Sequence, residues 1–150
     1  DVFQHLAQLA AGSLDGVFCS QFVEHLPPAD YSKLVMEAAR KLVPGGVLAI
    51  ETQNPECLAI FAKSFYIDPT HVKPIPAAQL RFLFEQAGLE KITTHYLSPA
   101  SQQLPILPQL EISTTDADGL RRFNKAVENF NAAFFGGMDY AVIGWKPGGR

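Results

Sequence analysis

The sequence is poor in cysteine, in basic residues and in long hydrophobic runs. Its two cysteines, Cys19 and Cys57, have neither the spacing of metal ligands nor the number needed for a disulfide framework. Lys and Arg total 12 against 15 Asp and Glu, without a basic cluster, so we expect no nucleic-acid surface. No apolar run approaches the roughly 20 residues that a membrane-spanning helix needs. These absences indicate a reduced, cytoplasmic protein that does not span a membrane.

Hydrophobic residues make up 47% of the 150 residues, which is enough for one core and predicts a single domain over residues 1–150. Apolar spacing predicts alternating strands and helices, as is typical of an α/β fold. The expected strands are 14–19, 47–52, 89–97 and 140–145. The expected helices are 2–9, 30–42, 54–63, 76–87 and 116–130. The segment 98–114, rich in proline and polar residues, predicts a loop that covers the site.

Three finer expectations concern the helices. Asp30 is the expected N-cap of the helix that follows Pro27-Pro28, and Lys41 is expected on its solvent-facing side. Asn54, which precedes Pro55, is the expected N-cap of the next helix.

The most informative stretch runs from residue 14 to residue 26. A buried strand ends at Cys19-Ser20-Gln21, and Glu24-His25 follow it. Farther along, Pro44-Gly45-Gly46 precede a second buried strand. Ligands of open α/β sheets bind beyond the carboxyl ends of the strands, so the chemistry is expected around residues 19–25.

These segments resemble the second half of the class I S-adenosylmethionine-dependent methyltransferases. In that family a strand with a polar end and a Glu-His pair precede a Pro-Gly-Gly turn. Residues 66–74, which contain Asp68-Pro69-Thr70-His71-Val72, are similar to a loop of the bacterial branch that acts on the ends of surface polysaccharides. Residues 80–89 extend the similarity, which is strongest over residues 13–97.

The resemblance implies an α/β fold with a partial Rossmann-like methyltransferase sheet, strands four to seven with flanking helices. It also implies S-adenosylmethionine as the cofactor of the intact protein. Asp1 matches the acidic residue that accepts a hydrogen bond from the adenine amino group. Cys19, Ser20 and Gln21 match the strand end that lines the methionine or adenosyl side. Alternatively, these three residues only pack their own turn, and Asp1 is a disordered terminus.

The cofactor loop of the family is absent from this sequence. Such a loop is rich in glycine because its backbone must approach the ligand closely. Adjacent glycines occur here only at 45–46, 136–137 and 148–149, and none of these pairs follows an N-terminal strand. The acidic residue that holds the ribose is also missing, and the chain begins at Asp1 instead of Met. We therefore interpret the chain as the C-terminal part of a methyltransferase domain and expect it to be inactive alone.

Glu24 and His25 are the first candidate catalytic residues. A carboxylate beside an imidazole can position a substrate hydroxyl or take its proton, because histidine titrates near neutral pH. By resemblance, some quinone-synthesis members use this pair and an earlier glutamate around a divalent metal. That earlier position is Gln21 here, so the sequence leaves a metal open. Alternatively, Glu24 binds a backbone amide and His25 packs under the proline turn.

His71 is the second candidate for catalysis. By resemblance its loop faces the acceptor, which makes His71 a candidate base for methylation of an oxygen and Tyr66, Asp68 and Thr70 candidate substrate-binding residues. Alternatively, residues 68–71 form a turn whose side chains bind their own backbone. His5 and His95 have no partner pattern and are expected on the surface.

The combined prediction is a methyltransferase acting on an oxygen of a small or saccharide-linked acceptor. The competing prediction is a non-catalytic, methyltransferase-like remnant that serves protein assembly. In the family, the strand equivalent to 14–19 is central, so without its neighbours it would be an exposed edge, and we expect the chain to form a homo-oligomer through that edge.

Overall fold

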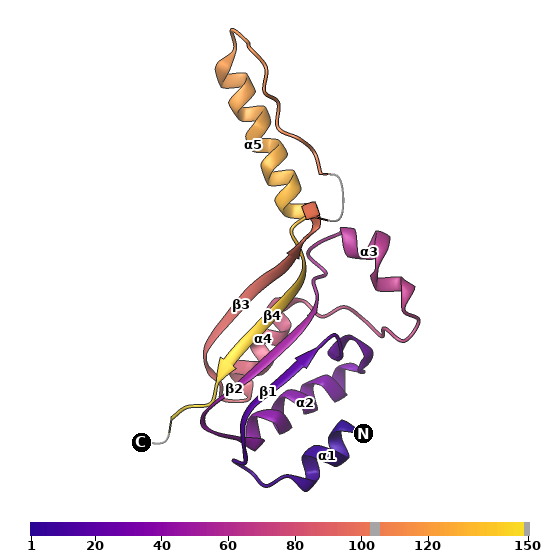
Figure 1. The fold of residues 1–150 in the computed structure, drawn as a ribbon, viewed down its shortest axis with the longest axis vertical. Coiled ribbons are helices and arrows are strands. Elements are labelled where there is room, and N and C mark those ends of the chain that lie inside the picture. Colours follow the sequence, from indigo (N-terminus) through magenta and orange to yellow (C-terminus); the bar gives the residue numbers. More distant parts are fainter. Residues whose placement is uncertain (103–105, 149–150) are drawn as a thin grey trace.

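The computed structural model describes residues 1–102 and 106–148. Its centre is a four-stranded sheet with the order β1-β2-β4-β3, and β1 and β2 are parallel whereas β4 runs antiparallel to both β2 and β3 (Figure 1). The strands are β1 (Leu14–Ser20), β2 (Leu42–Gln53), β3 (Glu90–Pro99) and β4 (Gly137–Trp145). This is the expected α/β fold with a mixed sheet, and all four expected strands are present.

Within the described residues, five α-helices and three short 3-10 helices accompany the sheet. The α-helices are α1 (Val2–Gln8), α2 (Pro28–Lys41), α3 (Ala59–Lys63), α4 (Ala77–Gln86) and α5 (Ala117–Phe134). The 3-10 helices are η1 (Val23–His25), η2 (Phe65–Ile67) and η3 (Ala100–Gln102). Of the described helices, none is long and apolar enough to cross a membrane.

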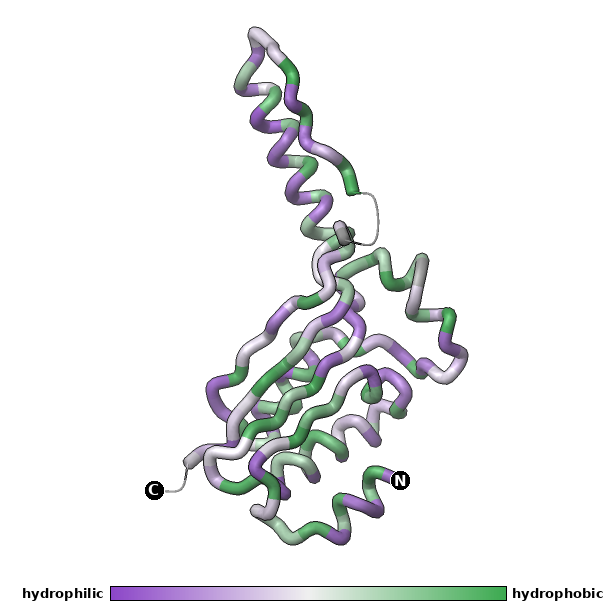
Figure 2. The backbone as a smooth tube through the Cα atoms, viewed as in Figure 1, coloured by the Kyte–Doolittle hydropathy of each residue, from purple (hydrophilic) through white to green (hydrophobic). Residues whose placement is uncertain are grey.

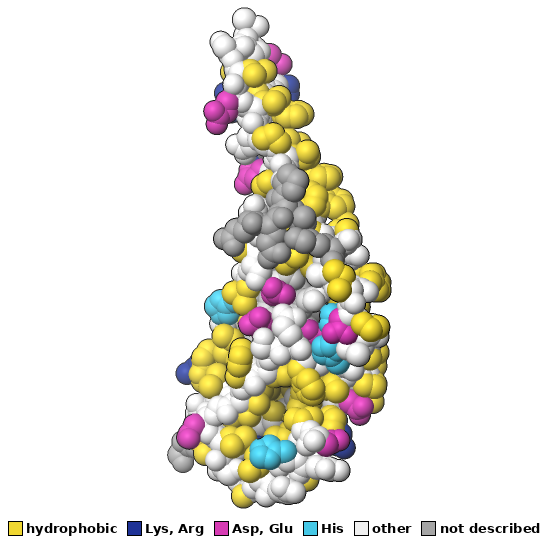
Figure 3. Space-filling view, turned by 45° about the vertical axis from the view of Figure 1, so that its right-hand side comes forward, with side chains coloured by type: hydrophobic (Ala, Val, Ile, Leu, Met, Phe, Trp, Pro, Cys, Tyr) yellow, Lys and Arg dark blue, Asp and Glu magenta, His cyan; other side chains and the backbone are white. Residues whose placement is uncertain are grey.

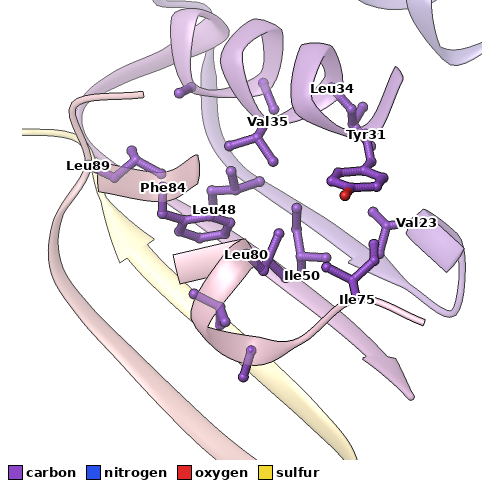
Figure 4. Packing of buried hydrophobic residues seen from close by; sticks show 14 of the residues in the cluster. Val23, Tyr31, Leu34, Val35, Leu48, Ile50, Ile75, Leu80, Phe84 and Leu89 are labelled. Carbon is purple, nitrogen blue, oxygen red and sulfur yellow. The ribbon is translucent and has the colours of Figure 1, made fainter. Parts of the chain in front are cut away.

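The main core lies between the sheet and helices α2 and α4. Leu48 and Ile50 alternate along β2 on the face that meets these helices, and both are fully buried. Tyr31 and Val35 from α2 and Phe84 from α4 close over them (Figure 4). Figure 2 shows the same concentration of hydrophobic residues along the central strands. This layer holds the carboxyl end of β1 in place, where the site begins.

Strand β1 is an edge strand in the described part of the chain, because it pairs with β2 alone. Its side chains alternate between the two faces of the sheet. Phe18 points away from the helical layer and is 70% exposed. On the helical side, α1 and α2 leave an apolar groove of about 360 Å³ along β1, which Val17 and Cys19 line.

Three helix details differ from the sequence prediction. Helix α2 begins at Pro28 with Asp30 in its first turn and no side-chain cap, because a proline tolerates the first helical position without an N–H. Lys41 is only 1% exposed and donates a hydrogen bond to the carbonyl oxygen of Leu9. Its long side chain reaches the end of the α1 segment, which compensates for burial of the charge.

The third difference concerns α3, which begins at Ala59. Asn54 instead caps a turn, since its Oδ1 accepts a hydrogen bond from the backbone N of Glu56 at 3.0 Å. Its amide nitrogen donates to the Gly137 carbonyl at 2.8 Å, which ties the end of β2 to the start of β4.

Residues 106–135 form an arm that projects from one end of the sheet (Figure 1). The extended segment before α5 runs back along that helix. The side chain of Asn124 bonds the backbone of Leu110, and that of Asn131 bonds the backbone of Leu107. Each asparagine accepts a hydrogen bond from the backbone N–H of its leucine and donates one to the carbonyl oxygen of the same leucine. The expectation that residues 98–114 cover the site is therefore wrong for residues 106–114, because these asparagines bind them to α5. Residues 103–105 lie outside the described residues.

Candidate functional site

The site begins where β1 ends. Gln21 adopts a left-handed backbone conformation with φ of 48°, and its N–H donates to the Glu51 carbonyl at 3.0 Å. This turn directs the chain from the sheet into η1. The Gln21 side-chain amide donates to Asp139 Oδ1 at 3.2 Å, so this side chain is held toward β4. Gln21 therefore belongs to the strand end, and among the described residues its side chain bonds Asp139 and not the histidines that follow.

Glu24 is fully buried beneath the 3-10 turn. Its Oε2 accepts a hydrogen bond from the Thr52 hydroxyl at 2.8 Å, whereas its Oε1 is buried without a hydrogen-bond partner among the described residues. Buried carboxylate oxygens are costly unless they are paired. The alternative in which Glu24 binds a backbone amide with its side chain is not what the structure shows.

His25 lies at the end of a short chain of hydrogen bonds. Its Nδ1 is 2.8 Å from the Thr70 hydroxyl oxygen, and that hydroxyl donates to Asp68 Oδ1 at 2.6 Å. The Asp68 oxygen also accepts the Thr70 backbone N–H at 2.8 Å. These bonds from Thr70 lower the pKa of the Asp68 carboxyl below its ordinary value, because they favour the charged form.

His71 comes from the loop that follows η2. Its Nδ1 lies 2.6 Å from the Phe65 carbonyl oxygen, and its ring lies 4.7 Å from the Phe65 ring. The backbone N–H of Val72 donates to the Glu24 carbonyl at 2.8 Å, which fastens the loop to η1. As a result the rings of His25 and His71 lie 4.6 Å apart with an interplanar angle of 59°.

Glu24, His25 and His71 thus form one cluster, although His71 is distant in the sequence. One potential ligand atom from each residue lies within 4.8 Å of the other two. Figure 3 shows histidine and acidic side chains gathered on the face of the molecule below the arm. The three residues predicted as catalytic are brought together, and their geometry permits proton transfer, binding of a hydroxyl or binding of a cation.

The predicted substrate-binding residues have different positions. Asp68 and Thr70 form the self-bonded turn that was the alternative prediction. Thr70 also bonds His25, and a role of these residues in substrate binding stays a prediction. Tyr66 is 73% exposed and packs edge-on against Phe65 at 5.3 Å. Its hydroxyl makes no hydrogen bond to the residues that the structure describes, and Tyr66 lies in η2, directly before the loop that holds His71.

Two of the four predicted cofactor residues, Cys19 and Ser20, line the groove beside β1. Cys19 and Ser20 form part of its wall, together with Val2, which follows Asp1. Asp1 is the N-cap of α1, and its Oδ1 accepts the N–H groups of Phe3 and Gln4. Burial, and to a lesser degree the charge of Glu24, raises the pKa of the Cys19 thiol to about 11.

The fit of these residues to a nucleoside cofactor is partial. The groove lining is mostly apolar and suits the flat face of an adenine or a further apolar element. The charged sulfonium, the amino-acid group and the ribose hydroxyls of S-adenosylmethionine require polar partners. Among the residues predicted for the cofactor, Asp1, Ser20 and Gln21 offer such groups, so the chain fits one side of the cofactor.

Sequence reasoning missed two members of the site. Thr52 fixes Glu24, and its signal was available, because it is a polar residue on the inward, otherwise apolar face of β2. The Phe65 carbonyl orients His71, and a backbone contact of this kind leaves no residue-type signal. His5 and His95 are exposed, as expected.

Comparisons with known proteins point in one direction. Residues 1–94 match a family described as methyltransferase domain. A probable S-adenosylmethionine-dependent methyltransferase of Mycolicibacterium smegmatis is 35% identical over 82 residues, which cover 55% of this chain and 31% of that protein.

Solved structures agree with the sequence matches. The crystal structure of a SAM-dependent methyltransferase from Archaeoglobus fulgidus superposes with a TM-score of 0.92 and 33% identity, over 97% of this chain and 65% of that one. Phosphoethanolamine N-methyltransferase 2 of Haemonchus contortus, in complex with S-adenosyl-L-methionine, shares the fold with a TM-score of 0.58, over 93% of this chain and 35% of that one, at 18% identity. The chain thus spans less than two thirds of the length of these relatives.

Proposed function

Because this chain belongs to the family of S-adenosylmethionine-dependent methyltransferase domains, we propose that it forms the acceptor side of an enzyme that methylates a hydroxyl oxygen. The acceptor class we propose is small or saccharide-linked, as in the polysaccharide-modifying branch that the 66–74 loop resembles, with the quinone-synthesis branch as the second possibility. The observation that carries the proposal is the joining of His71 to the Glu24-His25 pair next to the carboxyl end of β1.

The His71 ring is held in one tautomer. A carbonyl oxygen only accepts hydrogen bonds, so the contact with Phe65 places the proton of a neutral ring on Nδ1. The lone pair then resides on Nε2. A histidine held in this tautomer is suited to take a proton from a hydroxyl, and its fixed orientation lowers the entropic cost of that step.

The second step concerns the acceptor. The hydroxyl of an acceptor is a weak nucleophile until its proton leaves. In the proposed reaction the acceptor oxygen forms a bond to a methyl carbon while its proton passes to His71 Nε2, which becomes an imidazolium. Glu24 and His25 lie against that ring and stabilise its positive charge and its position. Asp68 and Thr70 position His25 in turn, and Tyr66 at the loop surface contacts the acceptor.

The cofactor, when bound, supplies an electrophilic methyl group whose transfer leaves a neutral thioether. Asp1, Cys19, Ser20 and Gln21 are the residues of this chain that we propose to contact it. Since Asp1 Oδ1 caps α1, Oδ2 is the oxygen that would accept from an adenine amino group.

The test is a methyl-transfer assay on the full-length gene product with a panel of hydroxylated small molecules and saccharides. The expected result is an O-methylated product whose formation depends on the acceptor hydroxyl, and deoxy analogues of the same acceptors serve as controls. Transfer to nitrogen acceptors alone, or no transfer to any member of the panel at saturating cofactor, would contradict the proposal and favour an assembly role.

A further inference from the structure

We propose that Glu24, His25 and His71 bind a divalent transition-metal cation, for which Zn²⁺ is the best match. One potential ligand atom of each residue lies within 4.8 Å of the other two. Two imidazoles and one carboxylate are a donor set that holds zinc with one coordination position open. The burial of the three side chains runs from complete for Glu24 to intermediate for the two histidines.

An independent observation supports a cation at this position. Glu24 is fully buried, and its Oε1 has no hydrogen-bond partner among the described residues. An unpaired buried carboxylate oxygen destabilises the folded state, so such an atom in a folded protein requires an explanation. The Thr52 hydroxyl occupies Oε2 and thereby fixes the carboxylate with Oε1 available. A bound cation would satisfy this oxygen.

The hydrogen bonds of the two histidines determine which ring nitrogen carries the proton. The Thr70 hydroxyl donates its hydrogen bond to Asp68, so it accepts the hydrogen bond from His25 Nδ1. The Phe65 carbonyl does the same toward His71 Nδ1. Both rings therefore carry their proton on Nδ1 in the neutral form and keep a lone pair on Nε2. Metal-binding histidines are typically fixed in this way by a partner on the other nitrogen.

The chemistry of the donors also limits the kind of cation. Ca²⁺ and Mg²⁺ prefer six or more oxygen ligands, and this cluster offers one carboxylate. Imidazole favours zinc and its transition-metal neighbours. Gln21, at the position where the resemblance implied a glutamate ligand, bonds Asp139 instead, so the set proposed here contains His71 in its place.

The catalytic consequence of this site rests on the proposed function, whereas cation binding itself does not. With a cation bound, His71 Nε2 is a ligand, and the cation replaces it as the group that activates the acceptor hydroxyl. A metal ion lowers the pKa of a hydroxyl or water that binds at its open coordination position. No net oxidation occurs, and the released proton passes to solvent.

The experiment is a titration of the metal-free, full chain with Co²⁺, which reports ligand geometry by visible absorption, together with Zn²⁺ calorimetry. We expect one cation per chain and intense absorption bands of a four- or five-coordinate site. His71→Ala and Glu24→Gln should each weaken Co²⁺ affinity at least tenfold. Thr70→Val, which removes the acceptor that fixes His25, should weaken it about 10- to 100-fold, and Thr70→Ser should restore it.

Control variants exclude binding elsewhere. His5→Ala removes the histidine nearest the chain's amino terminus, and His95→Ala removes a surface histidine of β3 whose ring hydrogen-bonds the Thr93 hydroxyl. Both should retain the full Co²⁺ spectrum. Circular dichroism and thermal unfolding of each variant separate loss of ligand from loss of fold, and Zn²⁺ should raise the melting temperature of the parent chain but not of folded Glu24→Gln.

Three results would overturn the inference. They are no saturable binding, binding unaffected by Glu24→Gln and His71→Ala, and binding that is lost in His5→Ala or His95→Ala. A full-length protein that binds no cation yet depends on His71 for turnover would overturn this inference and support the proposed function. A protein that binds one cation at these residues without methyl transfer would support the site and contradict the function.

Discussion

At the scale of single residues, His71 combines a fixed orientation with a free nitrogen. Its Nδ1 is held by the Phe65 carbonyl at 2.6 Å, so Nε2 is available to an acceptor or a cation. We expect His71→Ala in the full-length gene product to lower turnover about 100- to 10,000-fold, the range for a positioned base. Cofactor affinity should change little, because the residues proposed for the cofactor lie along β1. Steady-state kinetics and cofactor titration measure the two effects.

The matched control for this prediction is His95→Ala, which removes an exposed histidine that is distant from the cluster in the sequence and hydrogen-bonds the Thr93 hydroxyl. It should leave turnover unchanged. Wild-type turnover in His71→Ala with a true acceptor would identify His71 as a structural turn residue.

Cys19 supplies a second test at this scale. Burial and the nearby charge of Glu24 raise the pKa of its thiol to about 11, so the thiolate accumulates only as the pH approaches that value. At pH 8 we expect alkylation roughly 200-fold slower than for a model thiol of pKa about 8.5, since the thiolate is the nucleophile. Rates of iodoacetamide labelling, measured in Cys57→Ala so that one thiol reports, check this.

Removing the charge of Glu24 tests the cause of the shift in the Cys19 pKa. Glu24→Gln eliminates a repulsion that disfavours the thiolate, so the pKa should fall and labelling should accelerate. The acceleration should be modest, because burial is the larger cause. Labelling of the parent protein as fast as the model thiol would contradict the prediction.

At the scale of elements, the sequence predicts those whose pattern is set locally. The apolar stripe of α2 and the apolar run of β2 correctly predict these two elements. Gly88, with φ of 74°, follows the end of α4 as expected. The predicted start of α3 and the predicted solvent exposure of Lys41 were wrong, because the positions of Asn54 and Lys41 depend on contacts with segments that are distant in the sequence. The same division applies to the site. Glu24, His25 and His71 could be identified by type and position, whereas their union depends on the Val72–Glu24 backbone bond.

The arm illustrates the limit of periodicity. Phe123, Val127 and Phe130 recur at helical spacing in α5, which correctly predicts the helix. Such a stripe normally faces a core, yet Phe123 and Phe130 are exposed and only Val127 is buried. Periodicity thus specifies the element and its apolar face but not what covers that face.

The Pro-Gly-Gly turn gives a prediction for an element. The pairing of β1 with β2 shifts register between Leu14 and Gly16, where the glycines form an irregularity in β2. A Cβ at Gly46 would lie 2.9 Å from the Val43 carbonyl oxygen and 3.0 Å from that of Asp15. These are backbone atoms that cannot move independently, so Gly46→Ala should lower the free energy of unfolding by about 1–3 kcal/mol.

Urea unfolding followed by circular dichroism measures this effect. Gly148→Ala is the matched control, because a Cβ there meets nothing within 4 Å. It should leave the unfolding midpoint unchanged. Equal midpoints for Gly46→Ala and the parent would mean that the turn relaxes to admit a side chain.

At the scale of the whole molecule, the distribution of cofactor contacts predicts weak binding. The residues that we propose for the cofactor form one side of its site, and the sequence has no glycine-rich loop or ribose-binding acid to form the other. We therefore expect it not to bind S-adenosylmethionine with the affinity usual for the family. Calorimetry on this chain decides the matter, and micromolar binding with unit stoichiometry would show that the strand end and the groove suffice.

The outer edge of β1 also has a consequence for assembly. In the described part of the chain β1 pairs with β2 alone, so the backbone groups along its outer edge are unpaired there. Phe18 is 70% exposed on one face, and the apolar groove of about 360 Å³ lies on the other. Edges of this kind pair readily with another chain. The exposed phenylalanines of α5 add a second apolar surface, but they lie on the arm and are separated from β1 (Figure 1).

We therefore expect the 150-residue chain to self-associate through β1, most simply as a symmetric dimer in which the two edge strands pair. Phe18→Lys should return it to a monomer, because a charge on an edge strand opposes pairing and this exposed position tolerates the substitution. Tyr66→Lys, at a similarly exposed aromatic in η2, is the control and should leave the dimer intact. Light scattering at micromolar concentration measures the outcome, and a 16.4-kDa monomer for the parent chain would mean that the edge does not drive association.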